Sequence, residues 1–327
     1  MKNDQPPLMS VIITTGPGYE SIRTTIKYLK RQTVKESLEI IIVSPALEWS
    51  AAIEDEFKDF YSTTLIEADI DTELYDTWVT AVRRSNAPIV VFGENHAFPE
   101  PEWAEAIIEA HKGPWAAVGC VIKNVNPDSV NSWAQLYMTY GRYTEPVESG
   151  EINDLPGHNT SYKRSILLDY GDDLRDMLIR TNIMHMDLRA RGYHLYMENK
   201  AKTNHLNVSK TSSILSDLFC NGQLYTAALA QYKRWSISKR ILHALLEPLI
   251  ILKHFRGTLQ SIRRAGQWNQ LIPAALPIIV IGLTAHFMGK LRGYVIGFGN
   301  AQQKTNSIEF DRFKYITEQD IKRVTNL

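Results

Sequence analysis

The chain contains few cysteines, and its charges balance. Cys120 and Cys220 are the only two in 327 residues, and they lie too far apart to form a cysteine metal motif. A disulfide between them is not expected in a chain that begins without a secretory signal. Lys plus Arg and Asp plus Glu number 36 each, so no excess of positive charge favours nucleic acid as a partner.

The N-terminus also lacks an apolar segment. It begins Met-Lys-Asn-Asp-Gln-Pro-Pro, without the apolar core of a signal peptide, so the first domain is expected to stay in the cytosol. The sequence contains no internal repeat and no low-complexity segment. Its length permits one large domain with an appendage.

Short apolar runs alternate with helical patterns over the first hundred residues. Apolar residues spaced at helical intervals predict helices over 19–32 and 75–84. The apolar runs predict four buried strands, at residues 9–15, 38–43, 64–68 and 89–92. This alternation predicts an α/β fold, with a mostly parallel sheet flanked by helices and joined by right-handed crossovers.

Polar side chains follow the fourth expected strand. Glu94 and His96 are two residues apart, so an extended backbone would direct both side chains to the same side. Open α/β sheets hold ligands at the carboxyl ends of their strands. A carboxylate and an imidazole so placed suit Mn²⁺ or Mg²⁺, with phosphate oxygens completing the shell. A polar strand end with a chance histidine fits the same triplet.

In order and spacing, residues 8–207 resemble the family 2 glycosyltransferases, which have the GT-A fold. Residues 11–15 are similar to the family's opening strand, and residues 94–96 fall on the triplet that holds metal and donor diphosphate. Ser44 stands where the family usually has an Asp that contacts uracil or ribose. The resemblance implies donor-binding residues at Thr15, Ser44, Asp69, Glu94 and Asn95.

The resemblance extends to the metal and acceptor sides. His205 falls on the late histidine that completes the metal shell in some members, which implies Glu94, His96 and His205 as ligands. His158 and Asn159 would lie at the mouth of the acceptor region, where a loop-capping role is equally open. Trp103, beside the triplet, is the candidate platform for a sugar ring.

One departure from the family bears on the mechanism. An inverting transferase needs a carboxylate that takes the proton of the acceptor hydroxyl. The family keeps it about ten residues before the glycine that closes the acceptor-site helix, but residues 180–183 before Gly192 contain no carboxylate. We expect a base displaced to Asp176 or Asp187. A solvated helix-face charge at Asp187, or a weakened or inactive relative, is the alternative.

The composition changes after residue 207. Residues 271–289 carry no Asp, Glu, Lys or Arg, but their length and two prolines make them a borderline span. Residues 241–252 are apolar and too short to span alone, and flanking basic residues with Trp235 and Trp268 suit a membrane interface. We expect a shallow or re-entrant pair of helices on the cytoplasmic leaflet. True spans, an apolar dimer interface or a solvated amphipathic face remain open.

The sequence therefore predicts three parts, a GT-A-like domain (1–207), a helical membrane-associating region (208–299) and a polar tail (300–327). The expected function is metal-dependent, inverting transfer of a sugar from a nucleotide-diphosphate sugar to a lipid-linked or glycan acceptor at the membrane. One rival is a catalytically silent scaffold, which the missing carboxylate favours and the Glu94–His96 pair opposes. The other is a nucleotidyltransferase, which the lack of a Gly-rich phosphate loop followed by Lys opposes.

Overall fold

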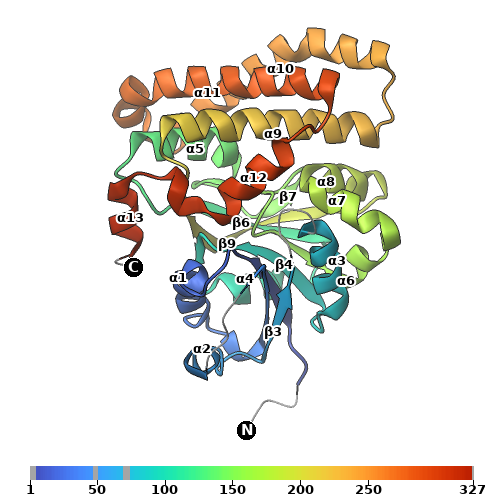
Figure 1. Cartoon of the computed structure of the whole chain (residues 1–327), viewed down its shortest axis with the longest axis vertical. Coiled ribbons are helices and arrows are strands. Elements are labelled where there is room, and N and C mark those ends of the chain that lie inside the picture. Colours follow the sequence, from blue (N-terminus) through green and yellow to red (C-terminus); the bar gives the residue numbers. More distant parts are fainter. Residues whose placement is uncertain (1–4, 47–50, 69–73, 326–327) are drawn as a thin grey trace. The chain divides into compact units, whose positions relative to one another are not determined.

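The computed structural model describes residues 5–46, 51–68 and 74–325 (Figure 1). The chain divides into two compact units. The first unit combines residues 1–123 with 148–205, and the second combines 124–147 with 206–327.

The first unit is built on a mixed nine-stranded sheet. Its strand order is β3-β2-β1-β4-β8-β6-β9-β5, with β7 paired to β9. The strands are β1 (Met9–Thr14), β2 (Leu38–Ser44), β3 (Ser62–Glu67), β4 (Ile89–Glu94), β5 (Ala97–Pro99), β6 (Ala117–Asn124), β7 (Gly150–Ile152), β8 (Ser161–Lys163) and β9 (Leu195–His205). The first four are parallel, as the sequence predicted, whereas β8 runs antiparallel to β4, and β5 and β7 run antiparallel to β9.

The central strands are buried along their whole length. Every residue of β1 and β2 is buried, which is typical of parallel strands covered by helices on both faces. Glu39 is the charged exception in β2, at 1 % exposure. Its carboxylate accepts hydrogen bonds from the Ser10 hydroxyl at 2.5 Å and from the Asn86 side chain at 2.6 Å, which satisfy it inside the core.

Helices flank this sheet, and the longer ones pack through apolar stripes. Helix α1, for example, buries Ile22, Ile26 and Leu29 at helical spacing. The helices of the first unit are α1 (Glu20–Leu29), α2 (Ala51–Glu56), α3 (Leu74–Arg84), α4 (Trp103–Ala110), α6 (Arg164–Leu168), α7 (Leu174–Ile179) and α8 (Thr181–Ala190). The expected mixed sheet flanked by helices is thus confirmed.

The register of the parallel strands brings their carboxyl ends to one edge. Thr14, at the end of β1, lies opposite Val43 of β2 and opposite Glu94, the last residue of β4. A polar edge is therefore formed where three buried strands stop, and it positions the candidate site.

The second unit is helical. It comprises α5 (Val130–Tyr140), α9 (Thr211–Tyr232), α10 (Ile237–Arg264), α11 (Trp268–Ile296), α12 (Ala301–Phe310) and α13 (Glu318–Thr325). Helices α9 and α11 lie side by side (Figure 1). Glycines permit this close approach, because a Cβ atom on Gly289 would lie 1.9 Å from the Phe219 carbonyl oxygen, and one on Gly293 would lie 2.1 Å from the Thr226 hydroxyl.

Two C-terminal helices continue through their prolines. Helix α10 continues through Pro248, and α11 continues through Pro273 and Pro277 to a length of 29 residues. Among the described residues, α11 is the one helix long and apolar enough to cross a membrane by length and composition alone. In its most apolar window, 28 % of the residues are buried inside the protein.

A buried histidine makes the stability of the first unit depend on pH. Burial, aided by the Lys163 cation, lowers the pKa of His111 to about 3. Its Nε2 lies 2.9 Å from the Ser161 hydroxyl. Below pH 6.5 His111 is protonated in the unfolded chain but stays neutral in the folded chain. The free energy of unfolding therefore falls as the pH drops, by about 2 kcal/mol at pH 5.

We therefore expect the unfolding free energy of His111→Gln to fall less than that of the wild type when the pH is lowered. The difference in unfolding free energy between pH 7.5 and pH 5, measured by urea denaturation, should be smaller in the variant than in the wild type. His194→Gln is the matched control, because His194 is exposed and pairs with Glu151 at the surface. An identical pH dependence in wild type and His111→Gln would contradict the assignment.

Candidate functional site

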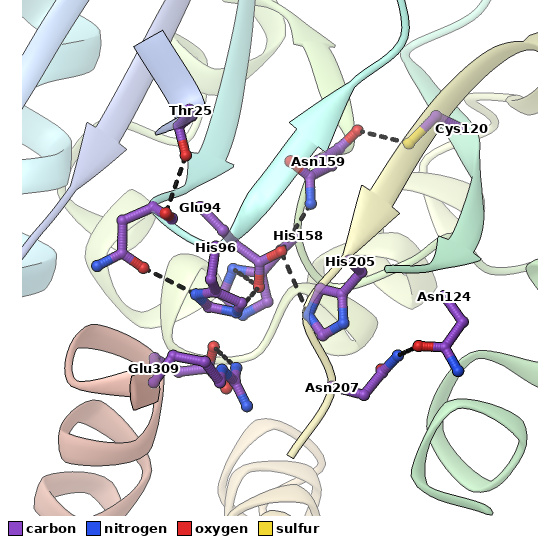
Figure 2. A network of polar contacts seen from close by, with 12 residues as sticks. Thr25, Glu94, His96, Cys120, Asn124, His158, Asn159, His205, Asn207 and Glu309 are labelled. Atoms are coloured by element: carbon purple, nitrogen blue, oxygen red, sulfur yellow. Dashed lines mark hydrogen bonds and ion pairs between the residues drawn. The ribbon is translucent and has the colours of Figure 1, made fainter. Parts of the chain in front are cut away.

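Glu94 is the centre of the polar edge. It ends β4, is 5 % exposed and lies opposite Thr14 in the sheet. The Asn159 side-chain amide donates a hydrogen bond to Glu94 Oε2 at 2.7 Å, and His158 Nδ1 lies 3.7 Å from Oε1 (Figure 2). A buried carboxylate thus sits at the carboxyl ends of the central strands.

A tight turn brings His96 to this carboxylate. The sequence predicted that an extended backbone would align the two side chains, but β4 stops at Glu94 and residues 95–96 turn before β5 begins. The Thr25 hydroxyl of α1 fixes the turn by donating to the Asn95 carbonyl oxygen at 2.9 Å. His96 Nδ1 lies 2.8 Å from Asn95 Oδ1, which holds the proton on Nδ1 and leaves Nε2 at 3.5 Å from Glu94 Oε1.

His205 reaches the same point from a remote strand. It ends β9, and the antiparallel pairing of β9 with β5 sets it opposite Ala97, next to His96. Its Nε2 lies 3.7 Å from Glu94 Oε2, and its ring centroid is 5.0 Å from that of His96. The structure therefore brings together the three ligands that the sequence proposed.

This donor set fits a divalent cation. One ligand atom from each of Glu94, His96 and His205 lies within 4.8 Å of the others. Ligand atoms about 2.1 Å from one ion lie roughly 3.0 Å apart at right angles and roughly 4.2 Å apart on opposite sides, so the spacing needs only small adjustments. Carboxylates suit Mg²⁺ and Mn²⁺, whereas imidazoles suit later transition metals, and the mixed set favours Mn²⁺ over Mg²⁺.

Asn159 orients the carboxylate, a role that its place in the sequence did not indicate. Its backbone is left-handed, with φ of 56°, a conformation that Asn tolerates better than most residues. Its N–H donates to the Phe92 carbonyl at 2.9 Å, and its own carbonyl accepts from the Cys120 thiol at 3.4 Å. Burial raises the pKa of Cys120 to about 12, so this thiol keeps its proton and stays a donor.

The other proposed donor residues line the same edge. Thr15 follows β1, is buried, and donates its N–H to the Val43 carbonyl at 2.9 Å. Ser44 ends β2, and its hydroxyl donates to the Gly16 carbonyl at 3.2 Å. Asp69 lies outside the described residues.

The acceptor-side residues differ in accessibility. His158 keeps 31 % of its side chain exposed beside Glu94. Trp103 is only 2 % exposed at the start of α4, in the core of the unit. Its ring offers no open face to a sugar, so the expected platform is corrected to a packing role.

The two carboxylates proposed as the base have different surroundings. Asp187 lies on α8, as expected, where its Oδ2 accepts from the Tyr170 hydroxyl at 2.8 Å and pairs with Arg191 Nε at 2.6 Å. Asp176 lies on α7, is largely exposed, and pairs with Arg175 at 3.4 Å. The role of either residue as the base stays a prediction.

Comparison with known proteins gives a family match. The model of glycosyl transferase family 2 matches residues 10–171. None of the curated proteins compared with the chain matches it.

Two solved structures resemble the chain at low identity. GalNAc-T7 with UDP, GalNAc and Mn²⁺ is 12 % identical with a TM-score of 0.47, over 62 % of this chain and 44 % of that one. TarS of S. aureus is 13 % identical with a TM-score of 0.43, over 87 % of this chain and 55 % of that one. The chain thus spans about half the length of the solved structures it resembles.

The cation site leads to a first binding test. Glu94→Gln removes the charge at nearly constant volume, so Mn²⁺ binding followed by isothermal titration calorimetry should fall below detection. Asn159→Gly removes the group that orients Glu94 and tolerates the left-handed backbone, and we expect an affinity roughly 10–100-fold lower. Glu151→Gln, at an exposed carboxylate, is the control. Wild-type Mn²⁺ affinity in Glu94→Gln would disprove the site.

Proposed function

The chain belongs to glycosyl transferase family 2, and on this premise we propose that it is a metal-dependent, inverting enzyme that takes its sugar from a nucleotide-diphosphate donor. The observation that carries the proposal is the cluster of Glu94, His96 and His205 at the carboxyl ends of the sheet strands. This is where an open α/β sheet binds a nucleotide.

The cluster suits the departure of a diphosphate. A divalent cation held there would neutralise charge that develops on the leaving diphosphate. Glu94 brings the negative charge that the cation needs, and Asn159 holds that carboxylate in one orientation. Asn95 fixes the tautomer of His96, so its Nε2 lone pair is directed to the site.

Inversion sets a second requirement on the protein. The acceptor oxygen attacks the anomeric carbon from the side opposite the diphosphate, and a carboxylate must take its proton. Such a group has to lie across the donor sugar from Glu94. The first turn of α8 is the position that the family resemblance favours.

The second unit supports attachment to a membrane. Ile241, Leu245 and Leu249 are 57 %, 73 % and 67 % exposed, and each lies one turn of α10 from the next. Basic residues on the same helix, among them Lys239, Lys253 and Arg256, are exposed as well. An exposed apolar stripe with basic residues suits an interfacial helix on an anionic leaflet such as the cytoplasmic one. We therefore propose shallow attachment and a lipid-linked acceptor.

The identity of the sugar donor can be tested through the thermal stability of the chain. A ligand that binds only the folded chain raises its stability by about 2.7 kcal/mol at 100 times its Kd, so the right nucleotide sugar should raise the thermal midpoint in the presence of Mn²⁺. A panel of UDP-, GDP- and dTDP-sugars, followed by release of the nucleoside diphosphate with an acceptor lipid extract, tests this. Binding without transfer to any acceptor would favour the silent scaffold, and no binding would refute the proposed activity.

The membrane face is testable by substitution. Replacing Ile241, Leu245 and Leu249 by Gln changes exposed side chains, so the fold should persist. The variant should lose the free energy of burying apolar surface in the membrane, roughly 25 cal/mol per Å². The wild type should sediment with phosphatidylserine vesicles and resist 1 M salt, and the triple variant should stay in the supernatant. Leu8→Gln, at an exposed leucine of the first unit, is the control. Release of the wild type by salt alone would contradict shallow insertion.

A further inference from the structure

A carboxylate outside α8 reaches the first turn of that helix. Asp154 lies in the segment between β7 and β8, and its Oδ1 is 2.8 Å from His185 Nδ1. Its Oδ2 is 3.4 Å from the Asn182 side-chain amide. About a quarter of the Asp154 side chain is exposed, so a bound molecule can reach it.

This contact lies where the chain has lost the carboxylate of its family. Residues 180–183 contain no acidic side chain, yet Asn182 within them contacts Asp154. The Thr181 hydroxyl donates to the Gly157 carbonyl at 3.3 Å, which ties the same segment to the same turn a second time. A carboxylate thus lies at the start of α8, although the first turn of the helix contains no acidic residue.

The segment that carries Asp154 also reaches the cation cluster. Four residues further on, His158 Nδ1 lies 3.7 Å from Glu94 Oε1, and Asn159 holds Glu94 Oε2. Residues 154–159 therefore connect the first turn of α8 with the centre of the polar edge. A donor sugar bound by its diphosphate at Glu94 would have this segment beside it.

His185 holds Asp154 in place from the core. It is fully buried on α8, and its Nε2 lies 2.8 Å from the hydroxyl of Tyr162 on β8. The phenol O–H donates to Nε2, which leaves the ring proton on Nδ1, where it donates to Asp154 Oδ1. Asp154 is thus held in one orientation by a buried hydrogen-bond chain that runs from Tyr162 through His185.

The alternative carboxylates are engaged differently. Oδ2 of Asp187 is held by both Tyr170 and the Arg191 guanidinium, and only 12 % of that side chain is exposed. Asp176 is paired with Arg175 on the surface of α7. Of these three carboxylates, Asp154 combines access, contact with the first turn of α8 and a buried positioning group.

We propose that Asp154 is the catalytic base of the transfer and that His185, backed by Tyr162, is its positioning residue. The inference rests on the proposed function and names the base for it. The acceptor O–H gives its proton to the Asp154 carboxylate while the oxygen forms a bond to the anomeric carbon. The bond from that carbon to the diphosphate oxygen breaks, and its electron pair leaves with the nucleoside diphosphate.

The first experiment separates chemistry from binding. In the full chain, Asp154→Asn should lower kcat on the order of 10²–10⁴-fold, with Mn²⁺ and donor affinities within about threefold of wild type. Asp173→Asn, at an exposed carboxylate of the same unit, is the matched control and should keep kcat within about twofold, whereas Asp187→Asn tests the rival base. In Asp154→Gly, added formate should restore part of the turnover, which loss of a merely structural contact would not allow.

The second experiment tests the positioning role. His185→Ala should lower kcat, whereas His185→Asn, whose amide can donate from the position of Nδ1, should recover part of it. An equal loss of kcat in both variants would mean that His185 only packs in the core, and it would overturn the positioning role proposed for it.

The outcomes distinguish this inference from the function it rests on. Turnover by the wild type together with a wild-type rate in Asp154→Asn would overturn the base and leave the proposed transfer standing. Loss of turnover in Asp187→Asn alone would assign the base to Asp187. Absence of turnover by the wild type with every donor that it binds would overturn both proposals.

Discussion

The site depends on the burial of one carboxylate. Glu94 is almost wholly excluded from water at the end of a central strand, and an isolated buried carboxylate is strongly unfavourable unless hydrogen bonds or opposite charge compensate it. An amide from Asn159 and imidazoles from His96 and His205 surround it. The left-handed conformation of Asn159 and the turn after Glu94 place these groups around the carboxylate.

The first unit meets this requirement by combining two kinds of strand. The parallel strands align their carboxyl ends and so present Glu94 beside Thr14. The antiparallel strands return from later parts of the chain and deliver the compensating groups, His205 at the end of β9 and Asn159 just before β8. A purely parallel sheet would leave Glu94 with fewer partners at this edge.

The segment from Asp154 to Asn159 has two roles in this arrangement. At one end it completes the surroundings of Glu94, and at the other it supplies a carboxylate to the first turn of α8. The first turn of α8, which contains no acidic residue, therefore receives a carboxylate from a neighbouring segment. Because His185 and Tyr162 are buried, the position of that charge is set by core packing.

The four parallel strands, α1, α3 and the Glu94–His96 motif could be predicted from the amino-acid sequence, because local apolar spacing and turn residues encode these features. It also indicated His205, through the family resemblance alone. Tertiary structure decided the three-residue strands β5, β7 and β8, which are too short to show a period, and the continuity of α10 and α11 through their prolines. It also decided that Trp103 is core and that Asp154 meets His185, 31 residues away. Such contacts arise when distant segments pack together, and no local sequence pattern predicts them.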